Sequence, residues 1–147
     1  EVLDVVLVHS DGRDLEIIEQ MGTLEVLAQL KREGLLRAFG MSTKTVAGGL
    51  AAAAVCDVVM VTYNPVHREE RPVLDECARL GRGLLVKKVL DSGHLLQVAG
   101  KPDAGRTPQQ ASLELVLAHP GTSAAIVGTI NPQHLRSNVE AARRALA

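Results

Sequence analysis

The chain has 147 residues, 46% of them apolar, and its 16 basic side chains nearly balance its 17 acidic ones. This length and apolar content fit a single domain over residues 1–147 with a buried core. The near-neutral charge argues against a nucleic-acid partner, which dense Lys and Arg surfaces would bind, and no apolar run reaches the roughly 18 residues of a membrane span.

Five short strands are predicted, each followed by a segment with apolar residues at helical spacing. They are expected at residues 5–9, 38–42, 58–63, 84–88 and 124–127. Apolar strands that alternate with helices are typical of a parallel α/β sheet. Such a sheet fits part of an eight-stranded (β/α)8 TIM barrel, or an open, flavodoxin-like sheet that cradles a phosphate ligand. A complete barrel takes about 250 residues, so this chain would supply only part of one.

A turn and then a first helix are expected after the first strand. Asp11 and Asp14 are predicted to make hydrogen bonds within that turn. Thr23 is expected to cap a helix that stops at Gly34, because glycine readily adopts the left-handed conformation that ends a helix. The alanine-rich run 51–54 is assigned to a helix that packs closely on the sheet.

The later helices carry clearer signals. A helix over 69–80 is expected to end at Gly81. Thr107-Pro108-Gln109-Gln110 matches a capping box with proline at the first helical position, and Asn131-Pro132 marks the start of the last helix in a similar way. The stretch 91–106 is rich in Gly and Pro, and a loop of that length predicts a functional lid.

The two cysteines indicate the cellular compartment of the protein and whether it binds a metal. Cys56 and Cys77 have no CxxC spacing and no histidine nearby at ligand spacing. We therefore expect reduced, buried thiols in a cytoplasmic protein, and no metal site.

Polar side chains gather where the predicted strands end. In a parallel α/β sheet or barrel, working residues lie at the carboxyl ends of the strands. Hydroxyls, ammonium groups and a helix start after Gly128 are what a phosphate or pyrophosphate ligand requires. The glycine-rich patterns GxGxxG and GxxxxGK[ST] are both absent, which argues against the usual nucleotide-binding loops.

Five motifs, taken in order, resemble the aldo-keto reductases from their fourth strand to their last helix. The motifs are Leu7-Val8-His9, Phe39-Gly40-Met41-Ser42, Val61-Thr62-Tyr63-Asn64-Pro65, Leu90-Asp91-Ser92-Gly93, and the run from Ile126 to Leu135 with Asn138. The resemblance covers essentially the whole chain. It implies a partial TIM barrel that binds NADP(H) or NAD(H) without metal and interconverts aldehydes or ketones and alcohols.

The resemblance also implies roles for individual residues. His9 would be the catalytic histidine that polarises the carbonyl oxygen of the substrate. The implied cofactor-binding residues are Ser42 and Thr43 at the nicotinamide carboxamide, Tyr63 beside the cofactor, Lys88, Leu90 and Ser92 at the pyrophosphate, and Gly128, Thr129, Asn131, His134 and Asn138 at the adenosine end.

The sequence departs from the family in ways that affect function. The family's aspartate, tyrosine and lysine come from earlier strands that this chain does not contain, so we expect it to be nearly inactive alone. Lys87 stands where the family often stacks an aromatic ring on nicotinamide. Lys87 and Lys88 also fit lysines with buried stems and solvated heads. Gly128 and His134 make the adenosine end less basic, which leaves the choice between NADP and NAD open.

The first residues of the chain suggest which partner the protein has. Glu1 lies close to the apolar run 5–8, which predicts a part of a longer polypeptide. The expected partner is then the N-terminal half of the barrel. The alternative function is a non-catalytic half-barrel that serves as a binding or assembly module, and its open sheet edges predict self-association.

Overall fold

The computed structural model describes residues 1–93 and 107–146. The strands are β1 (Leu3–His9), β2 (Leu36–Ser42), β3 (Val58–Thr62), β4 (Gly83–Lys87) and β5 (Ala124–Ala125). The helices are α1 (Asp14–Glu19), α2 (Thr23–Arg32), α3 (Val46–Val55), α4 (Arg71–Leu80), α6 (Pro108–Leu117) and α7 (Pro132–Ala145), with a 3-10 turn η1 (Asp91–Gly93).

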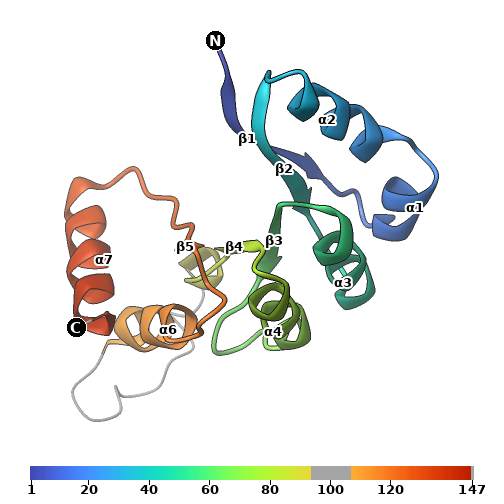
Figure 1. Cartoon of the computed structure of the whole chain (residues 1–147). Helices are drawn as coiled ribbons and strands as arrows, with labels where there is room; N and C mark the ends of the chain where they lie inside the picture. Colours follow the sequence, from blue (N-terminus) through green and yellow to red (C-terminus); the bar gives the residue numbers. More distant parts are fainter. Residues whose placement is uncertain (94–106, 147) are drawn as a thin grey trace.

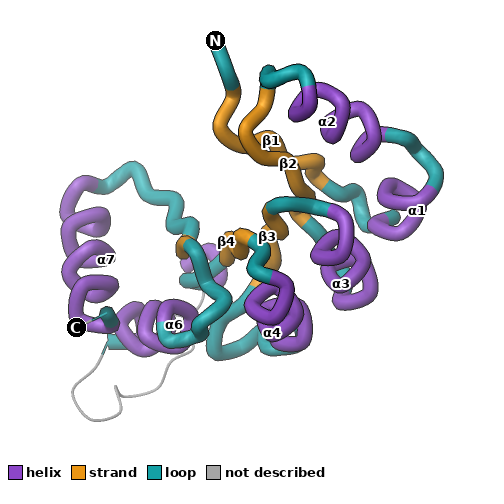
Figure 2. The backbone as a smooth tube through the Cα atoms, in the orientation of Figure 1, coloured by secondary structure: helices purple, strands orange, loops and turns teal. Residues whose placement is uncertain are grey.

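The five strands form one parallel sheet in the order β1-β2-β3-β4-β5, which is also their order along the chain. A flavodoxin-like sheet requires a switch in strand order, so that alternative is wrong. Neighbours in chain order, each joined by a helical crossover, are the arrangement of an arc of a (β/α)8 barrel. Figure 1 shows β1 and α7 at opposite ends of the arc, and Figure 2 shows the strands inside the curve of helices.

One face of the sheet carries the core. In β3 and β4 alternate side chains have no exposed surface, namely Val59, Val61, Leu84 and Val86. The side chains between them, such as Thr62 and Lys87, are only half-buried. Because side chains alternate across a strand, the helices cover one face and the other face carries the partly exposed set.

The alanine-rich helix packs as the sequence predicts. Ala52 and Ala53 of α3 are completely buried. A Cβ added at Gly49 would lie 2.6 Å from a methyl carbon of Val73, so the missing side chain allows α3 to approach α4 this closely. Small residues here set the distance between neighbouring helices.

The predicted helix ends are confirmed with one exception. Gly34 and Gly81 have φ of +77° and +65°, the left-handed stop that ends α2 and α4. The capping box of Thr107 and Gln110 is present at the start of α6, and the Asn131 side chain accepts a hydrogen bond from the Gln133 amide at the start of α7. The Thr23 cap is wrong, because Gly22 occupies the N-cap position and Thr23 already lies inside α2.

Two further segments differ from expectation. Helix α1 was not predicted, and its buried Ile17 and Ile18 join the core. The stretch 91–106 begins with the short turn η1, and residues 94–106 lie outside the described residues. No helix within 1–93 or 107–146 has the length and apolar character to cross a membrane.

Each edge strand of the sheet pairs on one side only. β1 bonds to β2 and β5 bonds to β4. On β1, Leu3 and Val5 are 59% and 47% exposed. The arc therefore presents an apolar strand with an unpaired backbone edge at its N-terminal end.

Candidate functional site

The parallel register brings the ends of four strands to one edge of the sheet. His9 of β1 pairs with Ser42 of β2, and Thr62 of β3 pairs with Lys87 of β4. In each case these are the last residues of their strands. The polar strand ends expected from the sequence therefore do lie together.

Lys87 ties the end of β4 to the end of β2. Its Nζ donates hydrogen bonds of 2.8 Å to Ser42 Oγ and 2.8 Å to the Thr43 carbonyl oxygen. Because β3 lies between these strands, the lysine side chain crosses over it. Burial lowers the pKa of Lys87, and the nearby Glu70 carboxyl opposes that effect. The ammonium group of Lys87 is thus bound to the protein, and the alternative of a solvated head is wrong for this lysine, whereas Lys88 is exposed.

Asp14 holds the same loop from the other side. Its carboxylate accepts hydrogen bonds from the Lys44 amide at 3.0 Å, the Thr45 amide at 2.8 Å and the Thr45 hydroxyl at 2.7 Å. Burial acts to raise the pKa of Asp14, but hydrogen bonds from Ser10, Thr45 and the two amides outweigh it and hold that pKa below its ordinary value. Gly48 leaves room for this carboxylate, since a Cβ there would lie 2.1 Å from the Asp14 Cβ.

The turn prediction for Asp14 is therefore incomplete. Besides the hydrogen bond from Ser10 in its own turn, Asp14 begins α1 and fixes the loop between β2 and α3. The prediction for Asp11 is confirmed, since its carboxylate accepts from the Arg13 amide at 3.0 Å. Together, Asp14 and Lys87 hold the segment 42–45 at both ends.

Glu70 is a buried carboxyl that the sequence did not reveal. It is 8% exposed, and its Oε1 accepts a 3.4 Å hydrogen bond from the Thr62 amide. Its Oε2 is buried and has no hydrogen-bond partner among residues 1–93 and 107–146. Burial raises the pKa of Glu70 to about 7, against the effects of the Thr62 amide and Lys87. The group therefore changes charge near neutral pH.

These side chains line a pocket of about 410 Å³, here called the His9 pocket. His9 is exposed at its mouth, and Thr43 is completely buried at its wall. The Oγ1 of Thr43 has no partner in the described part of the chain. The lining residues are His9, Thr43, Lys44, Thr62, Glu70, Lys87 and Lys88.

Lys88 follows β4 in an unusual backbone conformation. Its φ of +53° lies in the left-handed region, which is uncommon outside glycine. The Asn64 side-chain amide donates a 2.9 Å hydrogen bond to the Lys88 carbonyl and so holds the turn. The neighbouring Tyr63 is 2% exposed and belongs to the hydrophobic core rather than to the lining of the His9 pocket.

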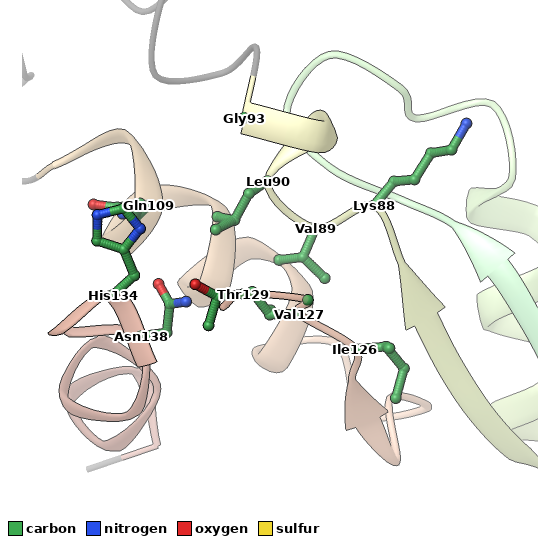
Figure 3. A pocket seen from close by; sticks show the side chains of 11 residues that line it. Lys88, Val89, Leu90, Gly93, Gln109, Ile126, Val127, Thr129, His134 and Asn138 are labelled. Atoms are coloured by element: carbon green, nitrogen blue, oxygen red, sulfur yellow. The ribbon is translucent and has the colours of Figure 1, made fainter. Parts of the chain in front are cut away.

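A second pocket of about 470 Å³, the Thr129 pocket, lies beyond Lys88. In Figure 3, Leu90, Thr129 and Asn138 point toward one another, while the Lys88 side chain extends away from His134 and Asn138. The lining residues are Lys88, Val89, Leu90, Gly93, Gln109, Ile126, Val127, Gly128, Thr129, His134 and Asn138.

The start of α7 is organised beside this pocket. Asn131 caps the helix, and its amide donates a 3.1 Å hydrogen bond to Thr129 Oγ1. Asn138 is 7% exposed, and its Oδ1 is buried without a partner among the described residues. Ser92 lies in η1, but its side chain is outside the described part of the structure.

Most of the expected site residues thus line one of two adjoining pockets, and Tyr63, in the core, does not. His9, Thr43 and Lys88 line the first; Lys88 also lines the second, with Leu90, Gly128, Thr129, His134 and Asn138. Ser42 and Asn131 hold neighbouring residues in place through hydrogen bonds. In the part of the chain that the structure describes, no three His, Cys, Asp or Glu side chains gather closely enough to hold a metal ion.

Comparison with known proteins gives a consistent result. The family model for the aldo/keto reductase family matches residues 1–104. The chain is 29% identical to pyridoxine 4-dehydrogenase of Escherichia coli, over 96% of the chain and 52% of that protein.

Among solved structures, one assigned to the aldo-keto reductases, from Pseudomonas aeruginosa, superposes with a TM-score of 0.87 at 50% identity, over 99% of this chain and 52% of that one. An aldo-keto reductase from Bacillus halodurans has a TM-score of 0.80 at 20% identity over 96% of this chain, which shows the shared fold. The chain spans about half the length of the relatives that it matches.

Proposed function

Since this chain belongs to the aldo/keto reductase family, we propose that it supplies the cofactor-binding half of an NAD(P)H-dependent carbonyl reductase. The arc of five parallel strands corresponds to half of the barrel in its structural relatives. The remaining half of the barrel would come from the preceding strands.

The observation that carries this proposal is the junction of the two pockets at Lys88. An extended dinucleotide needs two adjoining cavities along the strand ends, one for each end of the molecule. Thr43 and Asn138, one in each pocket, both have a buried oxygen that lacks a partner within the described residues. Buried polar atoms are normally satisfied, so these two fit a polar ligand such as the dinucleotide.

The residues of the His9 pocket would orient the reaction. The bound cofactor supplies the hydride. Ser42 and Thr43, held by Lys87, would fix the carboxamide of the nicotinamide. His9 would donate a hydrogen bond to the carbonyl oxygen of the substrate and so stabilise negative charge as it develops.

The adenosine end would lie in the Thr129 pocket. Lys88 offers an ammonium group between the two pockets, where the pyrophosphate would pass. Gly128, Thr129, His134 and Asn138 line the far side beside the start of α7, which favours negative charge.

The proton donor is proposed to come from outside this chain. Tyr63 is the only tyrosine, and it is buried in the core. A buried phenol that does not line the His9 pocket cannot reach a carbonyl bound there. We therefore expect the 147-residue chain to bind the cofactor weakly and to reduce carbonyls only when the rest of the barrel is supplied.

The test combines this chain with the N-terminal half of the Pseudomonas aeruginosa relative. The assay follows benzaldehyde-dependent oxidation of NADPH and NADH by either half alone and by both together. Turnover is expected only with both halves, and His9→Ala should lower it by about 10²–10⁴-fold. Robust turnover by this chain alone, or no cofactor binding by the combined halves, would overturn the proposal.

A non-catalytic half-barrel remains the second candidate function. It is favoured by the exposed Leu3 and Val5 on the unpaired edge strand. Light scattering after size-exclusion chromatography tests it. Self-association of the isolated chain is expected, and a monomer would count against an open apolar edge.

A further inference from the structure

The His9 pocket is rich in positive charge. Lys44, Lys87 and Lys88 line it, and among the described residues Glu70 is the only carboxyl in its lining. Burial favours the neutral form of that carboxyl, as its raised pKa of about 7 shows. The pocket therefore holds more ammonium groups than its own carboxyl can neutralise.

Lys87 differs from the other two lysines because its position is fixed. Two of its three N–H groups are used on Ser42 Oγ and the Thr43 carbonyl. Both of these acceptors are neutral, so the hydrogen bonds orient the ammonium group without pairing it directly with a carboxylate, although the nearby Glu70 and Asp14 carboxyls still act on its charge. An ammonium already ordered in a half-buried site loses little side-chain entropy when a ligand binds.

We propose that the His9 pocket binds an anionic group, a carboxylate or a phosphate, that is carried by the carbonyl substrate, with Lys87 as its fixed cation. This inference rests on the proposed carbonyl reductase function, and it names a class of substrate for it. Lys44 and Lys88 add attraction at the mouth of the pocket, where solvent weakens it.

The cofactor is another source of phosphate, but the structure offers it a different place. The Thr129 pocket lies at the start of α7 and shares only Lys88 with the His9 pocket. An anion at Lys87 would therefore be the substrate's own. Titration with inorganic pyrophosphate separates the two sources.

Glu70 would make the affinity for the anion depend on pH. The charged and titratable groups around it are Lys44, His67, Glu69, Lys87 and Lys88 in the surrounding pockets, His9 from β1, and Asp14 from α1. When Glu70 loses its proton, the pocket gains a negative charge and repels an anion. The part of the pH dependence that is due to Glu70 is the part that Glu70→Gln removes.

The first experiment measures binding to the chain directly. Benzoate and its neutral analogue benzamide are titrated against the isotope-labelled 147-residue chain, and amide shifts at Thr43 and Thr62 are followed by NMR. Benzoate is expected to bind at least about 10-fold more tightly than benzamide, a difference of about 1.4 kcal/mol. Equal affinities, or no shift with benzoate, would overturn the proposal.

Substitutions show which lysine supplies the positive charge that binds benzoate. Lys87→Met should abolish the preference for benzoate, Lys87→Arg should retain most of it, and Lys44→Met should reduce it about 2- to 3-fold. Arg37→Met is the matched control, since Arg37 lies near the amino end of β2, away from the carboxyl ends of the strands, in an exposed pair with Asp4. If Lys87→Met loses its native NMR spectrum, the proposal is judged from Lys44→Met. An unchanged preference for benzoate over benzamide in Lys44→Met counts against the proposal.

Two further measurements complete the test. Pyrophosphate should shift the amides of Thr129 and His134 and leave benzoate binding intact; competition at Thr43 would assign the pocket to the cofactor and overturn the proposal. The preference for benzoate should fall as pH rises through about 7, and Glu70→Gln should flatten that fall. An equally steep fall in Glu70→Gln would remove Glu70 from the argument.

The kinetic arm uses the combined halves. The ratio of kcat/KM for 4-carboxybenzaldehyde to that for benzaldehyde should be at least about 10, and Lys87→Met should bring it close to 1. A ratio near 1 in the unmodified protein refutes the inference while leaving the reductase intact. Failure to reduce either aldehyde refutes the proposed function instead, and the binding titration still judges the pocket.

Discussion

Replacing Asp14 with alanine is expected to remove about 3 kcal/mol of the free energy of unfolding. The carboxylate accepts hydrogen bonds from two backbone amides and one hydroxyl, those of Lys44 and Thr45, and the substitution leaves all three donors without their acceptor. A buried donor left unsatisfied costs about 1–3 kcal/mol. Lys44 and Thr45 are exposed residues, so water can reach these donors and we take about 1 kcal/mol for each.

Two comparisons sharpen this prediction. Asp14→Asn keeps one acceptor oxygen and should cost about half as much. Asp11→Ala, three positions earlier, removes an exposed pair with Arg13 and an exposed hydrogen bond from the Arg13 amide, which water can replace, and should change stability by less than about 0.5 kcal/mol. The loss should also depend on pH. The folded-state pKa of Asp14 lies below its ordinary 3.8, so its contribution is present above that value and disappears as pH falls through the folded-state pKa.

Urea unfolding followed by far-ultraviolet circular dichroism gives the required free energies. At neutral pH the order of stability should be parent, then Asp14→Asn, then Asp14→Ala, with Asp11→Ala close to the parent. The reasoning is refuted if Asp14→Ala costs no more than Asp11→Ala, or if its deficit persists undiminished in strong acid.

Three other outcomes follow from buried groups. Glu70→Gln should stabilise the chain by about 1–2 kcal/mol at about pH 8 and leave its stability unchanged at about pH 5. The folded-state pKa of Glu70 is about 7 against an ordinary 4.5, so the stability of the parent chain falls as pH rises between these two values. Urea unfolding at both pH values checks this. Gly40→Ala would place a Cβ 1.7 Å from the Val58 carbonyl oxygen, so it should force β2 and β3 apart and cost at least about 3 kcal/mol, measured by thermal unfolding. Cys56 and Cys77 are fully buried, and burial raises the pKa of each thiol to about 11, so iodoacetamide should label them at least about 100-fold more slowly in the native chain than in urea.

Features encoded within a few residues were predictable from the sequence. The capping box at Thr107 and the cap at Asn131 are local patterns, in which side chain and backbone bond within one turn. The parallel sheet was likewise predictable, since apolar strands alternating with helices have few other arrangements. The choice between barrel arc and open sheet required the strand order, which no local pattern encodes.

Features that depend on distant parts of the chain were missed. Asp14 looked like a turn residue because nothing nearby in sequence indicates its bonds to residues about 30 positions later. Glu70 precedes α4 as an ordinary charged residue, and its burial depends on packing against the ends of β3 and β4. The alternative of a solvated ammonium group for Lys87 was wrong for the same reason, since the oxygens that accept hydrogen bonds from Lys87 lie two strands away.

The turn at Lys88 has a consequence for the shape of any ligand. Within residues 1–93 and 107–146, only Lys88 is common to the linings of the His9 and Thr129 pockets, and the Asn64 hydrogen bond fixes its backbone. A molecule that fills both cavities must therefore be long enough to pass Lys88, and its two ends meet different linings. Compact metabolites can occupy one cavity at a time, so cleaving a two-ended ligand where it passes Lys88 should yield halves that bind independently and far more weakly than the whole.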